Sequence, residues 1–332
     1  MSSISRRMRV ALLGTLAILA FAIPASSASA LDPVVNLNGE WASHDRCPVD
    51  DPDFLSISAG EAFCISANSP DGTFKLGKIT TTTGESDLQF ALDVGQGGGL
   101  PWQEMIEPQG GALLADPAAV PGGILGLNFQ PIPMPACSNP IQCALRNLAI
   151  TLINRTRQLL VSGPFAVTAT VEPAGELADF DTLAPLIGGP IIKIPVKIHL
   201  QNPILGPNCY VGSDDDPIVL QPEVVGPAPI DIVSFDADGT LNPAGAFQAI
   251  VQTGTQADST FAAPGASGCG LKLPFPPGSD VHLLDGAVNQ RVGLPSPSGN
   301  NEVVLNDTTS HIAWGPVDGG AYSAAWHSAV LP

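Results

Sequence analysis

Residues 192–200 read Ile-Lys-Ile-Pro-Val-Lys-Ile-His-Leu, and apolar side chains alternate with other side chains along the whole stretch. Successive side chains of a β-strand point to opposite faces of the sheet, so this alternation predicts a strand with one buried face. The opposite face carries Lys193, Pro195, Lys197 and His199. Because proline cannot donate a backbone hydrogen bond to a neighbouring strand, Pro195 predicts a position at a sheet edge or beside a bulge.

The same alternation recurs on both sides of this stretch. Residues 72–92 are expected to form a hairpin that turns at Gly84–Glu85. Shorter strands are expected at 165–171, 218–220, 230–235, 247–251 and 303–305. The 35 glycines and 33 prolines fall at short intervals, which favours short strands joined by turns over long helices. The predicted fold is therefore mainly β, with antiparallel sheets arranged as in a β-sandwich.

One amphipathic helix is expected near residues 140–160. Asn139 can cap its start and Pro140 suits a first turn, while Ser-Gly-Pro at 162–164 ends it. Apolar residues recur at steps of three and four and predict a buried stripe: Ile141, Leu145, Leu148 and Leu152. The helix also carries three arginines, which would suit an anionic ligand, although solvated arginines on a packed helix are the preferred interpretation. Residues 279–292 could form a second short helix.

Residues 1–30 have the three parts of a secretory signal peptide. Arginines at positions 6, 7 and 9 precede an apolar run over 10–23, and Ala-Ser-Ala at 28–30 supplies the small residues before a cleavage site. A membrane anchor is the alternative, but this run is shorter than the roughly 20 residues that a spanning helix needs. We therefore expect an exported protein that begins at Leu31, with no transmembrane anchor after cleavage.

The remaining chain is expected to divide into three parts. These are an N-terminal β region over 31–136, a helical connection over 137–164 and a C-terminal β region over 165–332. A single continuous domain that joins the two β regions is the alternative.

The charge of the chain narrows the choice of partners. The signal peptide removes three of 13 basic residues and none of 31 acidic residues, so 10 − 31 gives the exported chain a formal charge of −21. Such a surface repels phosphate backbones, and nucleic acid is not an expected partner.

Six cysteines in an exported chain predict three disulfides. Proximity in the sequence favours the pairs Cys47 with Cys64, Cys137 with Cys143, and Cys209 with Cys269 among fifteen arrangements. Zinc ligation is the alternative, but the chain has no Cys-x-x-Cys and its five histidines are scattered.

No motif assigns a catalytic residue or a cofactor. Residues 235–241, Phe-Asp-Ala-Asp-Gly-Thr-Leu, match the first motif of haloacid-dehalogenase-type phosphotransferases, but only 91 residues follow and Lys272 is their one lysine. A turn between short strands explains the motif more simply. The run Gly-Ala-Ser-Gly-Cys at 265–269 lacks the last glycine of a serine-hydrolase elbow, so Ser267 is expected to be a loop residue. The histidines at 199, 282, 311 and 327 remain candidates for a triad formed in space.

Two acidic clusters, at 50–53 and 214–216, have the carboxylates that calcium prefers but not the spacing of an EF-hand loop. Solvated turns are the preferred interpretation of both. The chain has 18 aromatic residues, few for a sugar-binding face, and its four tryptophans are expected to be buried.

Three segments resemble a group of uncharacterised secreted proteins of actinobacteria. They are Leu-Gly-Pro-Asn-Cys-Tyr-Val-Gly-Ser at 205–213, Phe-Ala-Ala-Pro-Gly-Ala-Ser-Gly-Cys-Gly at 261–270, and Gly-Leu-Pro-Ser-Pro-Ser-Gly at 293–299. The resemblance is strongest in the C-terminal third and implies an envelope or extracellular protein without assigned catalytic residues. It also places Cys209 and Cys269 in recurring segments, consistent with a pair.

We therefore expect an exported, non-enzymatic β protein of the bacterial envelope or medium. One alternative is an extracellular binding module for a lipid, a glycan or a protein, which an apolar cavity or an aromatic strip would favour. The other is a secreted hydrolase with an unrecognised site, which a cleft joining a histidine to a nucleophile and a carboxylate would favour.

Overall fold

The computed structural model describes residues 35–97, 100–123, 132–134, 140–161, 165–184, 188–271 and 282–332. It is mainly β, with 41% of residues in strands and 17% in helices, and its strand pairs are antiparallel, as predicted.

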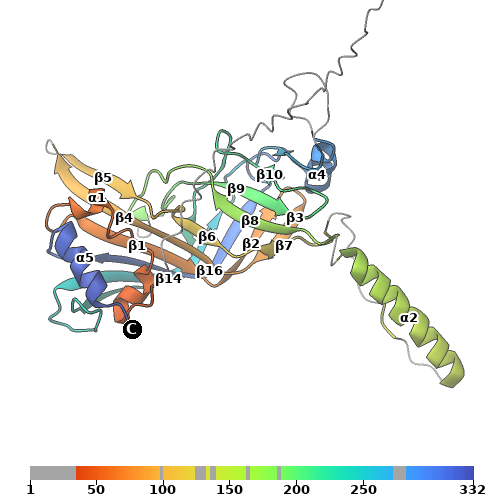
Figure 1. Ribbon diagram of the computed structural model, residues 1–332, viewed down its shortest axis with the longest axis horizontal. Helices are drawn as coiled ribbons and strands as arrows, with labels where there is room; N and C mark the ends of the chain where they lie inside the picture. Colours follow the sequence, from red (N-terminus) through yellow and green to blue (C-terminus); the bar gives the residue numbers. More distant parts are fainter. Residues whose placement is uncertain are drawn as a thin grey trace, which may run out of the picture.

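The larger sheet contains ten of the described strands (Figure 1). Its main path runs β12 (Glu223–Val225), β14 (Phe247–Asp258), β16 (Glu302–Trp314), β1 (Ala62–Ser69), β4 (Ser86–Gly97) and β5 (Leu100–Ile106). Four strands join this path from the side: β2 (Asp71–Leu76), β3 (Ile79–Thr83), β6 (Leu113–Ala115) and β13 (Ile230–Phe235). Strands from both predicted β regions therefore share this sheet, with β1 paired between β4 and β16.

The smaller sheet contains six described strands and is built around β9. Its path runs β15 (Ala266–Ser267), β10 (Tyr210–Val211), β9 (Ile194–Gln201), β8 (Thr168–Pro173) and β7 (Ala118–Ala119), and β11 (Ile218–Leu220) also pairs with β9. The alternation from Ile194 to Leu200 is confirmed, because all four apolar side chains of this face are buried against the larger sheet.

Short helices cover the face of the larger sheet that points away from the smaller sheet. One long helix stands apart from both sheets. The 3₁₀ helix η1 (Gly39–His44), α1 (Pro52–Leu55) and α5 (Gly319–Ser328) gather at one end of the molecule (Figure 1). The helix α4 (Asp285–Val292) lies beside the smaller sheet, and α2 (Pro140–Val161) projects from the body.

Two apolar cores lie on opposite faces of the larger sheet, because successive side chains of its strands point to opposite faces. In β1, Phe63 and Ile65 face the smaller sheet, whereas Ala62 and Cys64 face the short helices. The second core is aromatic: the indole of Trp41 is fully buried and lies 5.1 Å, centroid to centroid, from the ring of Tyr322. The hydroxyl of Tyr322 donates to the carbonyl of Ala313 at 3.1 Å, which satisfies the polar end of this buried side chain.

Two predicted disulfides are present. Cys47 is bonded to Cys64 with Cα atoms 6.0 Å apart, and Cys209 is bonded to Cys269 with Cα atoms 4.2 Å apart. Cys143 is disulfide-bonded, and its predicted partner Cys137 lies outside the described residues.

The hairpin predicted over 72–92 is wrong. The chain reverses at Gly77, which has a φ of +54°, so that Leu76 pairs with Ile79 and β3 returns along β2. Beyond Gly84, β4 pairs with β1 instead of β3. A run that looked like one strand in the sequence is thus two strands, because glycine accepts the left-handed conformation that a tight turn requires.

The prediction that Pro195 lies at a sheet edge or beside a bulge is also wrong. β9 is paired on both sides, and Pro195 lies opposite Val219 of β11. Its carbonyl accepts from the N–H of Ala174, one residue beyond the end of β8. The ladder with β8 ends at this point, so the missing N–H of Pro195 interrupts no regular pairing.

Candidate ligand-binding cavity

Side chains do not fill the space between the two sheets. A cavity of about 560 Å³ lies against the larger sheet. A second cavity of about 130 Å³ continues between the β2–β3 hairpin and the smaller sheet. The two cavities share five lining residues and therefore adjoin: Ser86, Leu113, Ile194, Pro222 and Leu305. The larger volume falls within the range of small-molecule sites, about 300–1,000 Å³.

The walls of the larger cavity are mostly apolar because each lining strand turns its apolar side chains inward. β1 contributes Ile65, β4 contributes Phe90, and β9 contributes Ile194. Trp314 of β16 lines the same cavity and stacks on Phe63, with ring centroids 6.2 Å apart. Such a surface has a high free energy in contact with water, so an apolar ligand would stabilise the cavity by displacing that water.

One rim of the cavity is formed by β13, which pairs with β14 along the side of the larger sheet. Ile230 and Ile232 of β13 line the cavity, and they are 36% and 68% exposed. Large apolar side chains exposed at a cavity rim are typical of an entrance for an apolar ligand.

A small polar patch interrupts the apolar wall on β14 and β16. It consists of Gln252, Gln256, Thr308 and Ser310, all of which line the larger cavity. Nε2 of Gln256 donates to Oγ of Ser310 at 3.2 Å, and both glutamines are less than one-tenth exposed. A few polar groups in an apolar site fix the orientation of a ligand, so this patch suits the polar end of an otherwise apolar molecule.

A β-bulge places the patch in the cavity. Gly254 pairs with Thr308 but Gln256 pairs with Leu305, and Asp307 between them has a φ of +46°. The bulge changes which residues of β16 face inward, from Leu305 before it to Thr308 and Ser310 after it.

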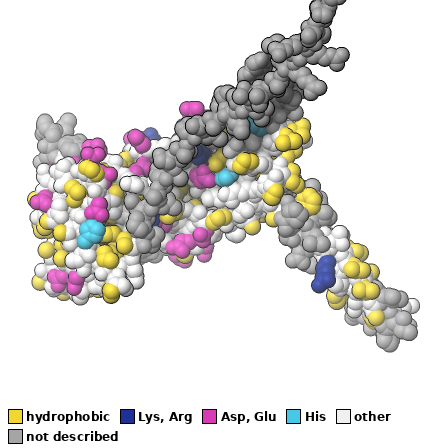
Figure 2. Space-filling view, viewed as in Figure 1, with side chains coloured by type: hydrophobic (Ala, Val, Ile, Leu, Met, Phe, Trp, Pro, Cys, Tyr) yellow, Lys and Arg dark blue, Asp and Glu magenta, His cyan; other side chains and the backbone are white. Residues whose placement is uncertain are grey.

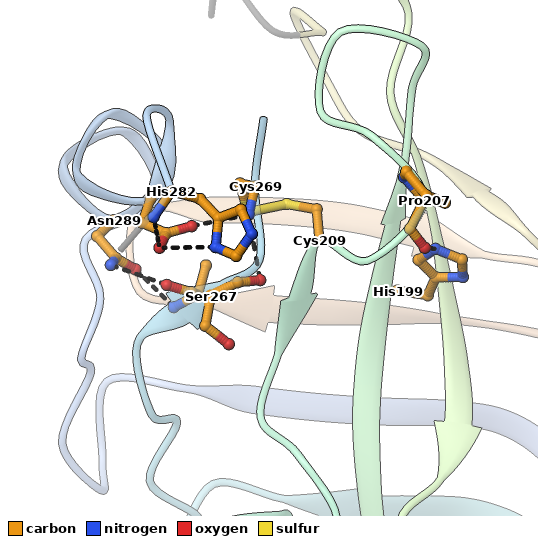
Figure 3. Close-up of a disulfide and its surroundings, with 9 residues drawn as sticks. His199, Pro207, Cys209, Ser267, Cys269, His282 and Asn289 are labelled. Carbon is orange, nitrogen blue, oxygen red and sulfur yellow. Dashed lines mark hydrogen bonds and ion pairs between the residues drawn. A yellow bond between two sulfur atoms is a disulfide. The ribbon is translucent and has the colours of Figure 1, made fainter. Parts of the chain in front are cut away.

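His199 lies on the outer face of the smaller sheet and does not form a triad. Its Nδ1 is 3.0 Å from Oε1 of Glu172. Its Nε2 is 3.0 Å from the carbonyl oxygen of Pro207, as Figure 3 shows. The ring stacks on Tyr210 with centroids 4.4 Å apart. The nearest partner of each ring nitrogen is a carboxylate or carbonyl oxygen and not a hydroxyl or thiol, so these contacts are not those of a base beside its nucleophile.

His327 and His282 are held by carboxylates. Nε2 of His327 is 2.8 Å from Oδ1 of Asp50, and the hydroxyl of Ser323 donates to the same oxygen at 3.1 Å. Ser323 and His327 thus both contact the carboxylate of Asp50. In a catalytic triad the histidine instead lies between the serine and the acid. Nδ1 of His282 is 3.9 Å from Oδ2 of Asp285.

His311 and His44 meet on the face of the larger sheet that η1 covers, with ring centroids 6.0 Å apart. His44 is fully buried, neither ring nitrogen has a hydrogen-bond partner, and burial lowers its pKa to about 3. Burial also lowers the pKa of His311, so both rings are neutral at pH 7. Ser66 lies opposite His311 across the β1–β16 pair, but its hydroxyl has no partner either. Neighbouring groups therefore do not activate this serine.

The two sequence motifs have structural roles. In the turn after β13, Asp236 accepts from the side-chain amide of Asn242 at 3.0 and 2.9 Å, and the carbonyl of Gly239 accepts from Glu40 of η1. The turn expected from the sequence is confirmed: Phe235 ends the antiparallel strand β13, and the residues after it form the turn. Ser267 is not the expected loop residue, because it belongs to the short strand β15 beside the Cys209–Cys269 disulfide (Figure 3). The side chain of Asn289 holds this strand by accepting from the N–H of Ala266 and donating to its carbonyl.

The acidic clusters make protein contacts. Asp51 caps α1 by accepting from the N–H of Asp53, and Asp214 forms an ion pair with Lys197 at 2.6 Å. In the part of the chain that the structure describes, no three His, Cys, Asp or Glu side chains converge as metal ligands would. The expected burial of tryptophan is confirmed for Trp41 and Trp326 and is wrong for Trp314, which is only partly buried; the side chain of Trp102 lies outside the described residues.

Taken together, the sheets and the cavity define an antiparallel two-sheet protein with an apolar interior site. In comparisons with known proteins, no family model, no curated protein and no solved structure matched the chain. None of the helices described here combines the length and apolarity required to cross a membrane.

Proposed function

We propose that this chain is an exported, non-enzymatic binding protein that holds an apolar, chain-like ligand such as a lipid acyl chain between its two sheets. The observation that carries the proposal is the pair of adjoining cavities of about 560 and 130 Å³, whose walls are predominantly apolar. A signal-peptide pattern and the two disulfides support export to an oxidising compartment.

The ligand has a defined orientation in this proposal. Its apolar part occupies the space between Ile65, Phe90 and Ile194, and its polar end contacts Gln256 and Ser310. A glycan fits this interior less well, because sugars need many hydrogen bonds and the polar patch is small. Lipid is therefore the ligand class that the geometry favours over glycan.

The test is to fill the cavity from inside. Ala67 lies on β1 and lines the larger cavity, so Ala67→Phe adds a ring to empty space. A dansylated fatty acid that fluoresces on transfer to an apolar site serves as the probe. We expect the wild type to bind it and Ala67→Phe to weaken binding at least ten-fold while the melting temperature stays level or rises.

The control is Ala119→Phe, because Ala119 is exposed on β7. It should bind the probe as the wild type does. A wild type that does not bind the probe, or an Ala67→Phe variant with unchanged affinity, would contradict the proposal.

A further inference from the structure

The helix α2 presents its apolar side to solvent. Leu148, Leu152 and Ile153 are 57%, 56% and 44% exposed. Figure 1 shows the helix projecting from the body, and Figure 2 shows apolar side chains along it. The buried stripe predicted from the sequence is therefore wrong at Leu148 and Leu152, which are the two members of that stripe whose side chains the structure describes.

The opposite side of α2 is the one held by the rest of the chain. The less exposed residues Cys143, Asn147, Ile150 and Asn154 follow steps of four, three and four. The side-chain oxygen of Asn154 accepts from the N–H of Ile132 at 3.0 Å, and its amide donates to the carbonyl of Ile132 at 3.1 Å. A helix on a globular protein normally buries its apolar residues, and α2 does so at Ile150 but leaves Leu148, Leu152 and Ile153 exposed.

Charge is segregated in the same region. Residues 117–171 contain no Asp or Glu, although the chain has 31 of them, and α2 carries Arg146, Arg155 and Arg157. These are three of the ten basic residues that follow the signal peptide. Arg155 lies two turns after Leu148, and its side chain is exposed on the same face. Figure 2 shows acidic side chains over the body and a basic side chain on the helix.

We propose that α2 is a membrane-surface anchor that lies in the headgroup region of an anionic lipid bilayer. Exposed leucines on one face, beside an exposed arginine in a stretch of sequence that contains no Asp or Glu, are the features that bind such helices to anionic lipid. The helix is not apolar enough to span a bilayer, which agrees with a position in the interface. Pairing with a second copy is disfavoured because it would bring two strongly acidic bodies and two sets of arginines together.

Binding of α2 to a bilayer does not require the cavity, so it is tested without a cavity ligand. The chain secreted by an expression host, with its first residue verified by mass spectrometry, is floated with two kinds of vesicle. One kind contains equal parts of phosphatidylglycerol and phosphatidylcholine, and the other contains phosphatidylcholine alone. The variants are Leu148→Ser/Leu152→Ser and Arg155→Gln.

We expect binding to the anionic vesicles, with partitioning at least ten-fold lower for the double leucine variant and about five-fold lower for Arg155→Gln. The matched control is Leu241→Ser/Leu271→Ser, since these leucines are 61% and 79% exposed on the body. This control should bind as the wild type does, and unchanged melting temperatures should show that each variant is folded.

Three results would overturn the assignment. One is equal binding to both kinds of vesicle, and another is wild-type binding by the double leucine variant. The third is dimerisation, detected by sedimentation, that the double leucine variant abolishes without any vesicle binding by the wild type. That result would identify a second copy as the occupant of this face. Failure of the dansyl probe to bind would leave the vesicle result unaffected, so the two proposals fail separately.

Discussion

His44 shows how burial without hydrogen bonds affects a titratable side chain. Its ring is fully buried beside Trp41 and His311, and neither ring nitrogen has a partner, while its backbone carbonyl accepts from the indole of Trp326 at 2.8 Å. Protonation would place an uncompensated charge in the aromatic core, which is why the pKa is lowered to about 3.

This pKa predicts a pH dependence of stability. Between about pH 6.5 and pH 3 the unfolded chain binds a proton at His44 and the folded chain does not, so this contribution to stability falls as the pH falls. The slope is about 1.4 kcal/mol per pH unit, and the full contribution is present above pH 6.5. His44→Leu should remove this slope when the free energy of unfolding in urea is measured from pH 7 to pH 4.

The variant His327→Leu is the control, because His327 is about half exposed and paired with Asp50. It should leave the steep part of the pH profile in place. If the profiles of wild type and His44→Leu ran parallel over this range, the buried histidine would not be the source of the slope.

At the scale of the elements, the two described disulfides should contribute unequally to the free energy of unfolding. Cys47 and Cys64 are separated by 17 residues, whereas Cys209 and Cys269 are separated by 60. In the chain-entropy model the longer loop constrains the unfolded state more, which corresponds to about 4 kcal/mol for the second bond and about 3 kcal/mol for the first.

Urea unfolding of Cys47→Ala/Cys64→Ala and Cys209→Ala/Cys269→Ala measures the difference. The second variant should be the less stable of the two. Because all four cysteines are buried, the packing losses are comparable and the loop length decides the order. The reverse order would show that loop entropy does not dominate.

Short strands bounded by turn residues could be predicted from the sequence. The strands β11 and β13 have the predicted bounds, 218–220 and 230–235. The helix over 140–160 was also found, although its apolar residues could not show which side would be buried. The period of apolar residues shows that a helix has an apolar and a polar face. Which face is buried depends on the segments that pack against the helix.

Other elements gave no sequence signal. β1 packs on both faces, so its sequence Ala-Phe-Cys-Ile-Ser-Ala-Asn-Ser does not alternate. The helix α5 begins with Gly319 and Gly320, which disfavour helix formation. It forms because Asp318 caps its first turn and Tyr322 is fully buried under the sheet, and these are tertiary effects.

The cavity belongs to the whole molecule and could not be predicted. Ile65, Phe90 and Ile194 read as ordinary core residues, and only the separation of the two sheets leaves space between them. The polar patch depends on the bulge at Asp307, which reverses the inward face of β16. Sequence alternation specifies which side chains share a face, but not whether the opposing face touches them.

The acidity of the whole molecule leads to the last prediction. Residues 31–332 carry 10 basic and 31 acidic side chains, a formal charge of −21, so most carboxylates have no basic partner and the folded body repels itself. Salt screens this repulsion, since the Debye length falls from about 30 Å at 0.01 M to about 10 Å at 0.1 M. At pH 7 the melting temperature should therefore rise with sodium chloride over this range.

The same salt series near pH 4 is an internal control, because Asp and Glu are about half protonated there and the repulsion is weaker. The rise in melting temperature should be much smaller than at pH 7. If the melting temperature at pH 7 fell with salt, ion pairs such as Arg46–Asp87, whose nitrogen and oxygen are 2.9 Å apart, would outweigh the general repulsion. A rise confined to pH 7 would instead show that self-repulsion dominates the electrostatics of the folded body.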